Sequence, residues 1–271
     1  MKGSYRIGEA FGIGIFVHWS FPLLLFYVLV SSLGSGLVMA FNAVVFVLAV
    51  FGCVLLHELG HSLAARRYEI GTHDITLLPI GGVARLMRLP DEPRQELVIA
   101  IAGPAVNLGI AAVLSLVAFM LGKPVPAGLT ALSSDTAILY GLISANLILI
   151  AFNMIPAFPM DGGRVLRALL AMKKGMLPAT EIAAGLGKMM AVLMFIGAFF
   201  LSPVLFITAV FIYVAGEAEL QSMRRNDAGR ENSIGIDTVM SRLSGAFAVR
   251  DGFVYREEPR KVRGRVIDQQ D

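Results

Sequence analysis

Residues 37–63 read LVMAFNAVVFVLAVFGCVLLHELGHSL, and the first twenty of them, residues 37–56, carry no charge. That is about the length of apolar helix that crosses the hydrocarbon core of a bilayer. The run leads into His57, Glu58 and His61, and on a helix the two histidines lie one turn apart on the same face. Their imidazoles can therefore bind one zinc ion while Glu58 stands beside the open position of that ion. The stretch predicts a metal site within a membrane-spanning helix.

The composition of the whole chain favours a membrane location. Its 271 residues are 56% hydrophobic and 16% charged, whereas an ordinary soluble domain is about 45–50% apolar. Ionisable groups at membrane depth are costly, so a carboxylate between two imidazoles there indicates a functional site. The single cysteine, Cys53, makes no intrachain disulfide, and its apolar neighbours favour packing over metal binding.

Further apolar stretches predict an all-α polytopic membrane protein with about six transmembrane helices. The predicted spans are about 13–33, 37–66, 96–121 and 134–152, followed by a pair of helices within 179–216. The pair is preferred to one over-long span because Ser202-Pro203 interrupts the uncharged residues 189–216.

The segment between the second and third spans has a different pattern. Two short apolar runs lie on either side of Gly81-Gly82 within residues 72–89, which predicts a small β-hairpin at the cytosolic side of the core. His73 and Asp74 flank the first run, and we expect them to be solvated rather than bound to a metal.

The distribution of basic residues predicts the orientation of the spans. If six spans begin and end in the cytosol, every Lys and Arg before residue 217 except Lys123 lies on the cytosolic side. This asymmetry follows the positive-inside rule, so we expect a multi-pass protein with N- and C-termini in the cytosol. His57 lies nine residues before Arg66, about 13 Å along a helix, which places the metal a short way below the cytosolic surface.

The chain divides by composition into residues 1–216 and residues 217–271. The second part carries ten Lys and Arg and ten Asp and Glu, so it is neutral overall. We expect a membrane-embedded domain followed by a polar cytosolic tail. No basic stripe with interleaved aromatic residues occurs, so nucleic acid is not an expected partner.

A catalytic zinc ion usually has three protein ligands and one open position, so a third ligand must come from elsewhere in the chain. Asp161 is the best candidate, because it follows a proline-interrupted segment at the predicted cytosolic end of the fourth span. The alternative role for Asp161 is an N-cap of the helix that follows. Asn153, Asn107 and Asn146 are candidates for hydrogen bonds to a substrate carbonyl or backbone, and helix-helix packing is their alternative role.

Three ordered motifs resemble those of one known family. They are His57-Glu58-Leu59-Gly60-His61, then Ala102-Gly103-Pro104-Ala105-Val106-Asn107, then Asn153 with Pro156, Pro159, Asp161 and Gly162. Together they are similar to the site-2 protease family of intramembrane zinc metalloproteases, over roughly residues 5–216.

This resemblance implies a site and a substrate class. It implies that His57, His61 and Asp161 ligate one zinc ion per chain, and it gives Glu58 the role of general base and then acid. It also implies a substrate that is itself a transmembrane helix, such as a membrane-tethered anti-sigma or pro-sigma factor. Such a protein works in contact with the lipid bilayer.

The resemblance is to a compact form of the family. The sequence has no segment long enough for an inserted PDZ domain, and residues 217–271 are too few for a complete CBS domain. The other function class that suits a metal site in membrane helices is a transporter or scaffold without proteolysis. An ion path needs polar groups along its length, whereas here they gather at one depth, which favours the protease.

Overall fold

The computed structural model describes residues 3–123, 137–200, 206, 208–225, 247–250 and 253–256. The chain forms two compact units, Met1–Leu220 and Gln221–Asp271. In the second unit, strands β5 (Phe247–Arg250) and β6 (Phe253–Arg256) pair antiparallel. All the candidate site residues lie in the first unit.

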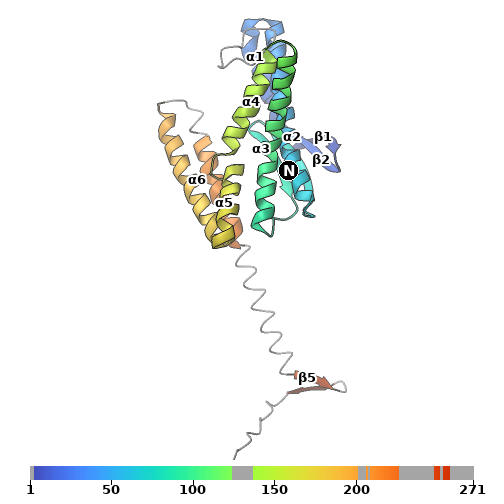
Figure 1. The fold of residues 1–271 in the computed structure, drawn as a ribbon, viewed down its shortest axis with the longest axis vertical. Coiled ribbons are helices and arrows are strands. Elements are labelled where there is room, and N and C mark those ends of the chain that lie inside the picture. Colours follow the sequence, from blue (N-terminus) through green and yellow to red (C-terminus); the bar gives the residue numbers. More distant parts are fainter. Residues whose placement is uncertain are drawn as a thin grey trace, which may run out of the picture. The chain divides into compact units, whose positions relative to one another are not determined.

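Helices make up most of the first unit (Figure 1). They are α1 (Ser20–Ser32), the short 3-10 helix η1 (Leu33–Ser35), α2 (Leu37–Arg66), α3 (Pro93–Met120), α4 (Ala137–Asn153), α5 (Asp161–Lys174) and α6 (Met176–Ala198). Residues 208–225 are also helical. Helices α2, α3 and α6 are long and apolar enough to cross a membrane, while α1 and α4 are shorter apolar helices. The chain is a mostly helical membrane protein.

The helices predicted in the middle of the chain lie where the sequence places them. Helix α2 continues through the zinc motif to Arg66, and α3 begins at Pro93, whose fixed φ suits the first helical turn. Residues 189–216 contain parts of two helices, because α6 and the helical residues 208–225 are separate elements. Helix α6 begins at Met176, slightly earlier than expected.

A four-stranded sheet in the order β1-β2-β3-β4 lies against α2. Its strands are β1 (Ser4–Ala10), β2 (Ile13–His18), β3 (Thr72–Leu78) and β4 (Gly81–Leu86). The predicted hairpin is thus present as β3 and β4, but it is one half of a larger sheet, because β2 pairs parallel with β3. Ile13, Leu59 and Ile75 form a buried cluster that joins the sheet to α2.

The N-terminal region differs from the predicted span over residues 13–33. The first six of those residues form β2, which pairs antiparallel with β1, and the α-helix begins only at Ser20. Ile13 and Ile15 are buried while Gly14 is half-buried, so the burial repeats every two residues as in a strand. A continuous apolar run hides that period in the sequence.

Asp74 is not solvated as predicted. It is buried in β3 and lies directly opposite Arg85 of β4, whose Nε donates a hydrogen bond of 2.9 Å to Oδ1. This hydrogen bond holds the pKa of Asp74 below its ordinary value. His73 is exposed, as expected. The cross-strand pair therefore helps to fix the register of the hairpin.

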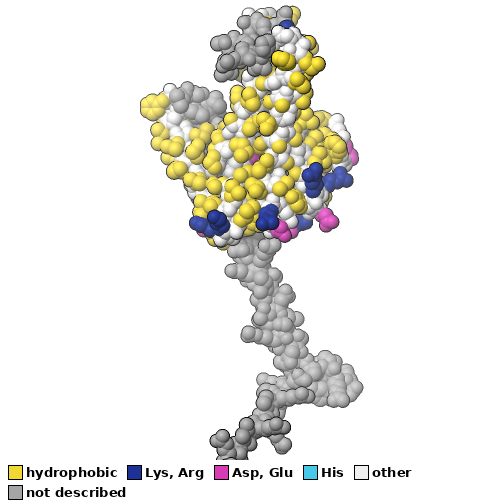
Figure 2. Space-filling model, viewed as in Figure 1, with side chains coloured by type: hydrophobic (Ala, Val, Ile, Leu, Met, Phe, Trp, Pro, Cys, Tyr) yellow, Lys and Arg dark blue, Asp and Glu magenta, His cyan; other side chains and the backbone are white. Residues whose placement is uncertain are grey.

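The outward faces of the long helices are apolar. Leu37 and Phe41 of α2, and Val113 and Phe119 of α3, are each more than 60% exposed. Figure 2 shows hydrophobic side chains over this part of the surface, with Lys and Arg gathered toward one end of the helices. Apolar faces of this extent are suited to contact with lipid rather than water.

Candidate metal centre and active site

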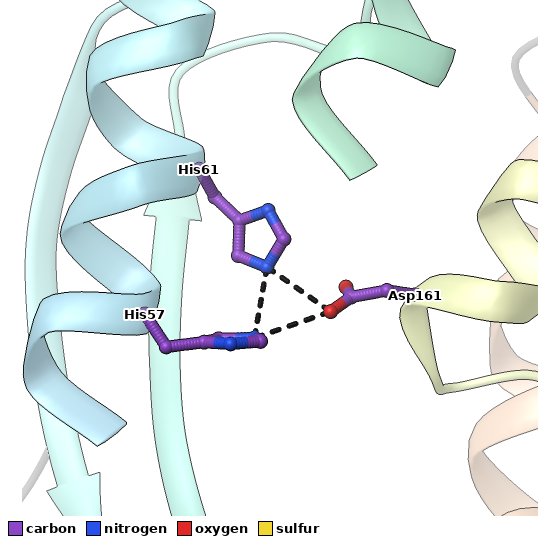
Figure 3. A group of neighbouring side chains, drawn as sticks. All are labelled: His57, His61 and Asp161. Atoms are coloured by element: carbon purple, nitrogen blue, oxygen red, sulfur yellow. Dashed lines mark hydrogen bonds and ion pairs between the residues drawn. The ribbon is translucent and has the colours of Figure 1, made fainter. Parts of the chain in front are cut away.

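Helix α2 carries its two histidines on one face (Figure 3). Their ring centroids are 4.7 Å apart and their Nε2 atoms are 3.0 Å apart. His57 is buried and His61 is half-buried. Both rings point toward the start of α5, so a spacing of four residues becomes a pair of ligand atoms directed at one point.

Asp161 supplies the third ligand atom. Its Oδ2 lies 3.1 Å from Nε2 of His57 and 3.2 Å from Nε2 of His61. Asp161 is the first residue of α5, and the N-cap position belongs to Met160, with no side-chain hydrogen bond to the helix end. The N-cap alternative for Asp161 is therefore wrong, and its carboxylate faces the histidines instead.

The segment between α4 and α5 brings this carboxylate to the histidines. Residues 154–160 contain Pro156 and Pro159, which prevent a regular helix. The segment folds back so closely on the start of α5 that a Cβ at Gly162 would lie 2.4 Å from two of its carbonyl oxygens. The glycine after Asp161 is required by this close approach.

The three ligand atoms fit a zinc ion. They lie within 4.8 Å of one another, and the Nε2–Nε2 and Nε2–Oδ2 distances are 3.0–3.2 Å. Ligands about 2.0–2.1 Å from a tetrahedral zinc ion are about 3.3 Å from one another, so a small outward movement of the side chains admits the metal. Two imidazoles and one carboxylate are a donor set of catalytic zinc sites, which keep a fourth position open.

Helix α3 packs closely against the two histidines. Nδ1 of His61 is 2.7 Å from the carbonyl oxygen of Ile99, so with its proton donated there, His61 presents Nε2 to the metal. A Cβ at Gly103 would lie 2.3 Å from Nε2 of His61 and 2.7 Å from Nε2 of His57. Within the described residues, Nδ1 of His57 is buried without a hydrogen-bond partner.

Glu58 stands between the metal centre and the sheet. A Cβ at Gly82 in β4 would lie 2.7 Å from Cγ and 3.3 Å from Cδ of Glu58, so the Glu58 side chain lies against β4. Glu58 is not among the three residues that gather as metal ligands. A carboxylate beside the open position of a metal, but not bound to it, is placed to accept a proton.

The asparagines have different surroundings. Asn146 is buried and donates hydrogen bonds to the Leu142 carbonyl, at 2.8 Å, and to Sγ of Cys53, at 3.4 Å, which joins α4 to α2. Asn107 is also buried, and neither of its amide atoms has a partner in the part of the chain described. Asn153 is half-buried at the end of α4. Substrate binding by these three side chains stays a prediction, and Cys53 is a packing residue as expected.

Two features around the site were not found from the sequence. One is the Ile99 carbonyl, which any residue type would supply. The other is an ion pair between Glu96 of α3 and Arg167 of α5, which are 71 positions apart. The sequence signal for this ion pair was that Glu96 is a charged residue at the start of an apolar span. That signal does not identify Arg167 as its partner.

Comparison with known proteins identifies the family. The sequence profile of peptidase family M50 matches residues 45–140 and 125–197, more than half of the chain. A zinc metalloprotease of Methanocaldococcus jannaschii is 40% identical over 220 residues, which cover 81% of this chain and 61% of that protein. A solved structure of a site-2 protease from Methanocaldococcus jannaschii has 38% identity and a TM-score of 0.59, and the match covers 80% of this chain and 95% of that one.

The fold and the site define a membrane-embedded metallopeptidase in which two histidines and one aspartate are grouped where they could hold a metal ion. The chain belongs to peptidase family M50, and within it to the zinc metalloproteases of the site-2 protease type. The resemblance of the three sequence motifs to this family is confirmed, and so is zinc as the metal. The structure groups His57, His61 and Asp161 where they could hold one metal ion, and their role as its ligands stays a prediction. The chain spans about half to three fifths of the length of the curated relatives it matches, with shares of 61%, 51% and 48%.

Proposed function

We propose that the protein is an intramembrane endopeptidase that hydrolyses a peptide bond within or near the transmembrane helix of a membrane-tethered protein. Such cleavage is a step of regulated intramembrane proteolysis. The observation that carries the proposal is the three-ligand zinc site, with Glu58 beside it, inside helices whose outer faces are apolar. The test is to incubate the purified protein in lipid vesicles with single-span proteins from its own membrane and to measure product masses. Failure to cut any member of that set, with zinc present, contradicts the proposal.

The chemistry is the hydrolysis of an amide by water. When bound, zinc supplies a Lewis acid that polarises the scissile carbonyl and lowers the pKa of a coordinated water toward about 7. Glu58 takes a proton from the attacking water as the new carbon–oxygen bond forms. It then gives that proton to the amide nitrogen as the carbon–nitrogen bond breaks. Glu58 regains its ionised form, and the water is divided between the new carboxyl and amine groups.

A substrate helix must unwind before its carbonyl can reach this site, because helical carbonyls are hydrogen-bonded and shielded by side chains. The extended segment then needs new backbone partners in a place with little water. Strand β4 can supply them, since it is an edge of the sheet and its Gly82 lies against the Glu58 side chain. We infer that the unwound substrate adds as a strand along the free edge of β4.

This edge can be tested through the backbone N–H of Leu86. The next residue, Met87, donates its N–H to the Gly71 carbonyl beside β3 at 2.9 Å. Because N–H groups alternate in direction along a strand, the Leu86 N–H points to the free edge. Leu86→Pro removes this donor, and edge strands tolerate proline at such positions.

Binding is compared in proteins that also carry Glu58→Gln, which leaves the substrate uncut. In this background we expect Leu86→Pro to weaken substrate binding. One backbone hydrogen bond contributes about 0.5–1.5 kcal/mol, so the dissociation constant should rise about two- to tenfold. Leu86→Ala is the matched control, because it loses the same side-chain packing but keeps the N–H. Equal affinities of the proline and alanine variants for a labelled single-span substrate reject strand addition at this edge.

We further infer that the chain crosses the membrane six times, with the metal toward the cytosol. Helices α2, α3 and α6 each suit one span, and α1, α4 and the helical residues 208–225 complete the six. Lys and Arg gather toward one end of the described helices (Figure 2), and Arg66 lies at the end of α2 that follows the zinc motif. The positive-inside rule places this end in the cytosol.

The topology predicts where fused reporters are active. An enzyme that works only in the cytosol should be active when it is fused to the C-terminus of the chain. The same enzyme inserted after Lys123 should be inactive, because that position lies outside in the six-span arrangement. If the C-terminal fusion is active only with a reporter enzyme that works outside the cytosol, the six-span arrangement is wrong.

A further inference from the structure

Arg167 is the largest fully buried side chain among the described residues, with 1% of its surface exposed. Its Nε donates a hydrogen bond to Oε1 of Glu96 at 2.7 Å, and Nη2 contacts the same oxygen. Its Nη1 donates to Oε1 of Glu219 at 2.8 Å. Removing a guanidinium and a carboxylate from water is costly, and well-packed apolar side chains in their place often give equal or greater stability. Stability alone therefore does not account for this ion pair.

The pair joins α3, which contacts His61 through the Ile99 carbonyl, to α5, which carries Asp161. Glu96 is one turn before Ile99 in α3, and the Ile99 carbonyl is the oxygen that orients His61. Arg167 lies six residues after Asp161 in α5, about 9 Å along the helix axis. The contacts thus form a closed ring that runs from His61 through α3 to the ion pair, and back through α5 to the third ligand.

Arg167 also contacts the segment that leads into α5. Its guanidinium carbon lies 5.0 Å from the centre of the Phe158 ring, and Phe158 is three residues before Asp161. Phe158 is fully buried and packs with Ala183 and Ala184 of α6. One side chain therefore holds both the helix after the ligand and the segment before it.

We propose that Arg167 is a positioning residue for the metal centre. Its ion pair with Glu96 sets the distance between the Asp161 carboxylate and the two imidazoles. Helix α5 is attached to α3 at the ion pair, and the Asp161 carboxylate at its start contacts His57 and His61 of α2. Two attachment points on one stiff helix fix its direction. A metal site needs its ligands within about 0.5 Å of their working positions, so rotation of α5 about a single attachment weakens binding.

The experiment measures the metal site itself in the Glu58→Gln background. The inference rests on the zinc site that the proposed function also uses, but no peptide cleavage is needed to test it. Zinc affinity is measured by competition with a coloured chelator, and the geometry of the site is read from the absorption spectrum of the cobalt-substituted protein. If the Arg167 variants bind zinc as tightly as the parent, this inference fails but the proposed protease activity stands. If the wild-type protein cuts no peptide but the Arg167 variants bind zinc more weakly, the protease proposal fails and this inference stands.

The first variant is Arg167→Lys, which keeps the charge but loses the planar fork that holds Glu96. We expect its zinc affinity to fall about 10–100-fold, the usual effect of losing a partner that supports a metal ligand. The cobalt spectrum should change as well. Glu219→Gln is the matched control, because it alters the outer partner, whose side chain is 23% exposed, and leaves the contact with Glu96. It should keep the affinity and the spectrum of the parent.

The second variant is Glu96→Leu combined with Arg167→Met, which removes both buried charges of the pair. Glu219 loses its hydrogen bond from Nη1 of Arg167, but its side chain is 23% exposed and can be solvated. We expect this protein to fold with a similar midpoint of thermal unfolding, yet to bind zinc about 10–100-fold more weakly. Arg167→Lys decides the question if the double variant does not fold. Zinc affinity and a cobalt spectrum equal to those of the parent, in either variant, overturn the proposal.

Discussion

Glu58→Gln should leave zinc bound and stop peptide cleavage. Glu58 is not one of the three residues that gather as ligands, so its replacement takes nothing from the metal. Glutamine has a similar size, so it keeps the packing of this side chain against Gly82 of β4. It cannot accept the proton of the attacking water. Loss of a positioned general base lowers the rate about 10²- to 10⁴-fold, which in a slow membrane enzyme is complete inactivity.

The measurement compares wild type and variant in lipid vesicles with the same single-span substrate. Product masses report cleavage, and metal analysis of the same samples reports zinc content. Glu69→Gln is the matched control, because it makes the same chemical change at an exposed residue just beyond α2. A transporter or scaffold needs the ion or the shape rather than proton transfer, so it would keep its function in the variant. Equal cleavage by wild type and Glu58→Gln contradicts the mechanism.

The metal centre could be predicted because its parts follow local rules. A helix period places His57 and His61 together whatever the rest of the chain does. Asp161 is 100 positions from His61, and its place followed from the alternation of spans, which returns the chain to the same side of the membrane. In addition, Pro156 and Pro159 indicated an irregular backbone just before Asp161.

The sheet could be predicted only in part, because the apolar run hides the strand character of β2 and the joining of β2 to β3 depends on long-range pairing. The β3–β4 hairpin has its own turn and closes over a few residues. Strand β2 pairs antiparallel with β1 across a turn at Phe11 and Gly12, and its residues Gly14 to Val17 pair in parallel with Asp74 to Leu77, about sixty residues further along the chain. Nothing within residues 13–33 indicates that partner, and the whole stretch is apolar enough to be taken for one span.

The ion-pair partners of buried carboxylates were the other part that the sequence did not reveal. Asp74 and Arg85 face each other across a hairpin, so a register for the two strands would have predicted their contact. Glu96 and Arg167 have no such local relation, because they meet only when α3 packs against α5. Sequence patterns describe one element at a time, whereas the partner of a buried charge depends on how two elements pack.

Gly103→Ala should remove most of the zinc affinity while leaving the fold in place. The added Cβ would lie 2.3 Å from Nε2 and 2.6 Å from Cε1 of His61, and 2.7 Å from Nε2 of His57. Atoms that are not bonded to one another cannot approach this closely. Either α3 therefore moves away from α2, or the rings turn from the metal. We expect the zinc affinity, measured by chelator competition, to fall by about 10–100-fold or more, as when the support of a metal ligand is lost.

Gly109→Ala separates this local effect from a general effect on α3. It is the same substitution in the same helix, and a Cβ at Gly109 meets no atom within 4 Å. Alanine is the better helix former by about 1 kcal/mol, so both variants gain the same intrinsic helix stability. Gly109→Ala should therefore bind zinc like wild type with an equal or higher midpoint of thermal unfolding.

If Gly103→Ala also binds zinc like wild type, α3 does not press on the histidines, and the support assigned to this helix is wrong. If Gly103→Ala loses zinc yet unfolds near the temperature of the metal-free wild type, the fold is intact and the glycine is needed to leave space for the two imidazoles.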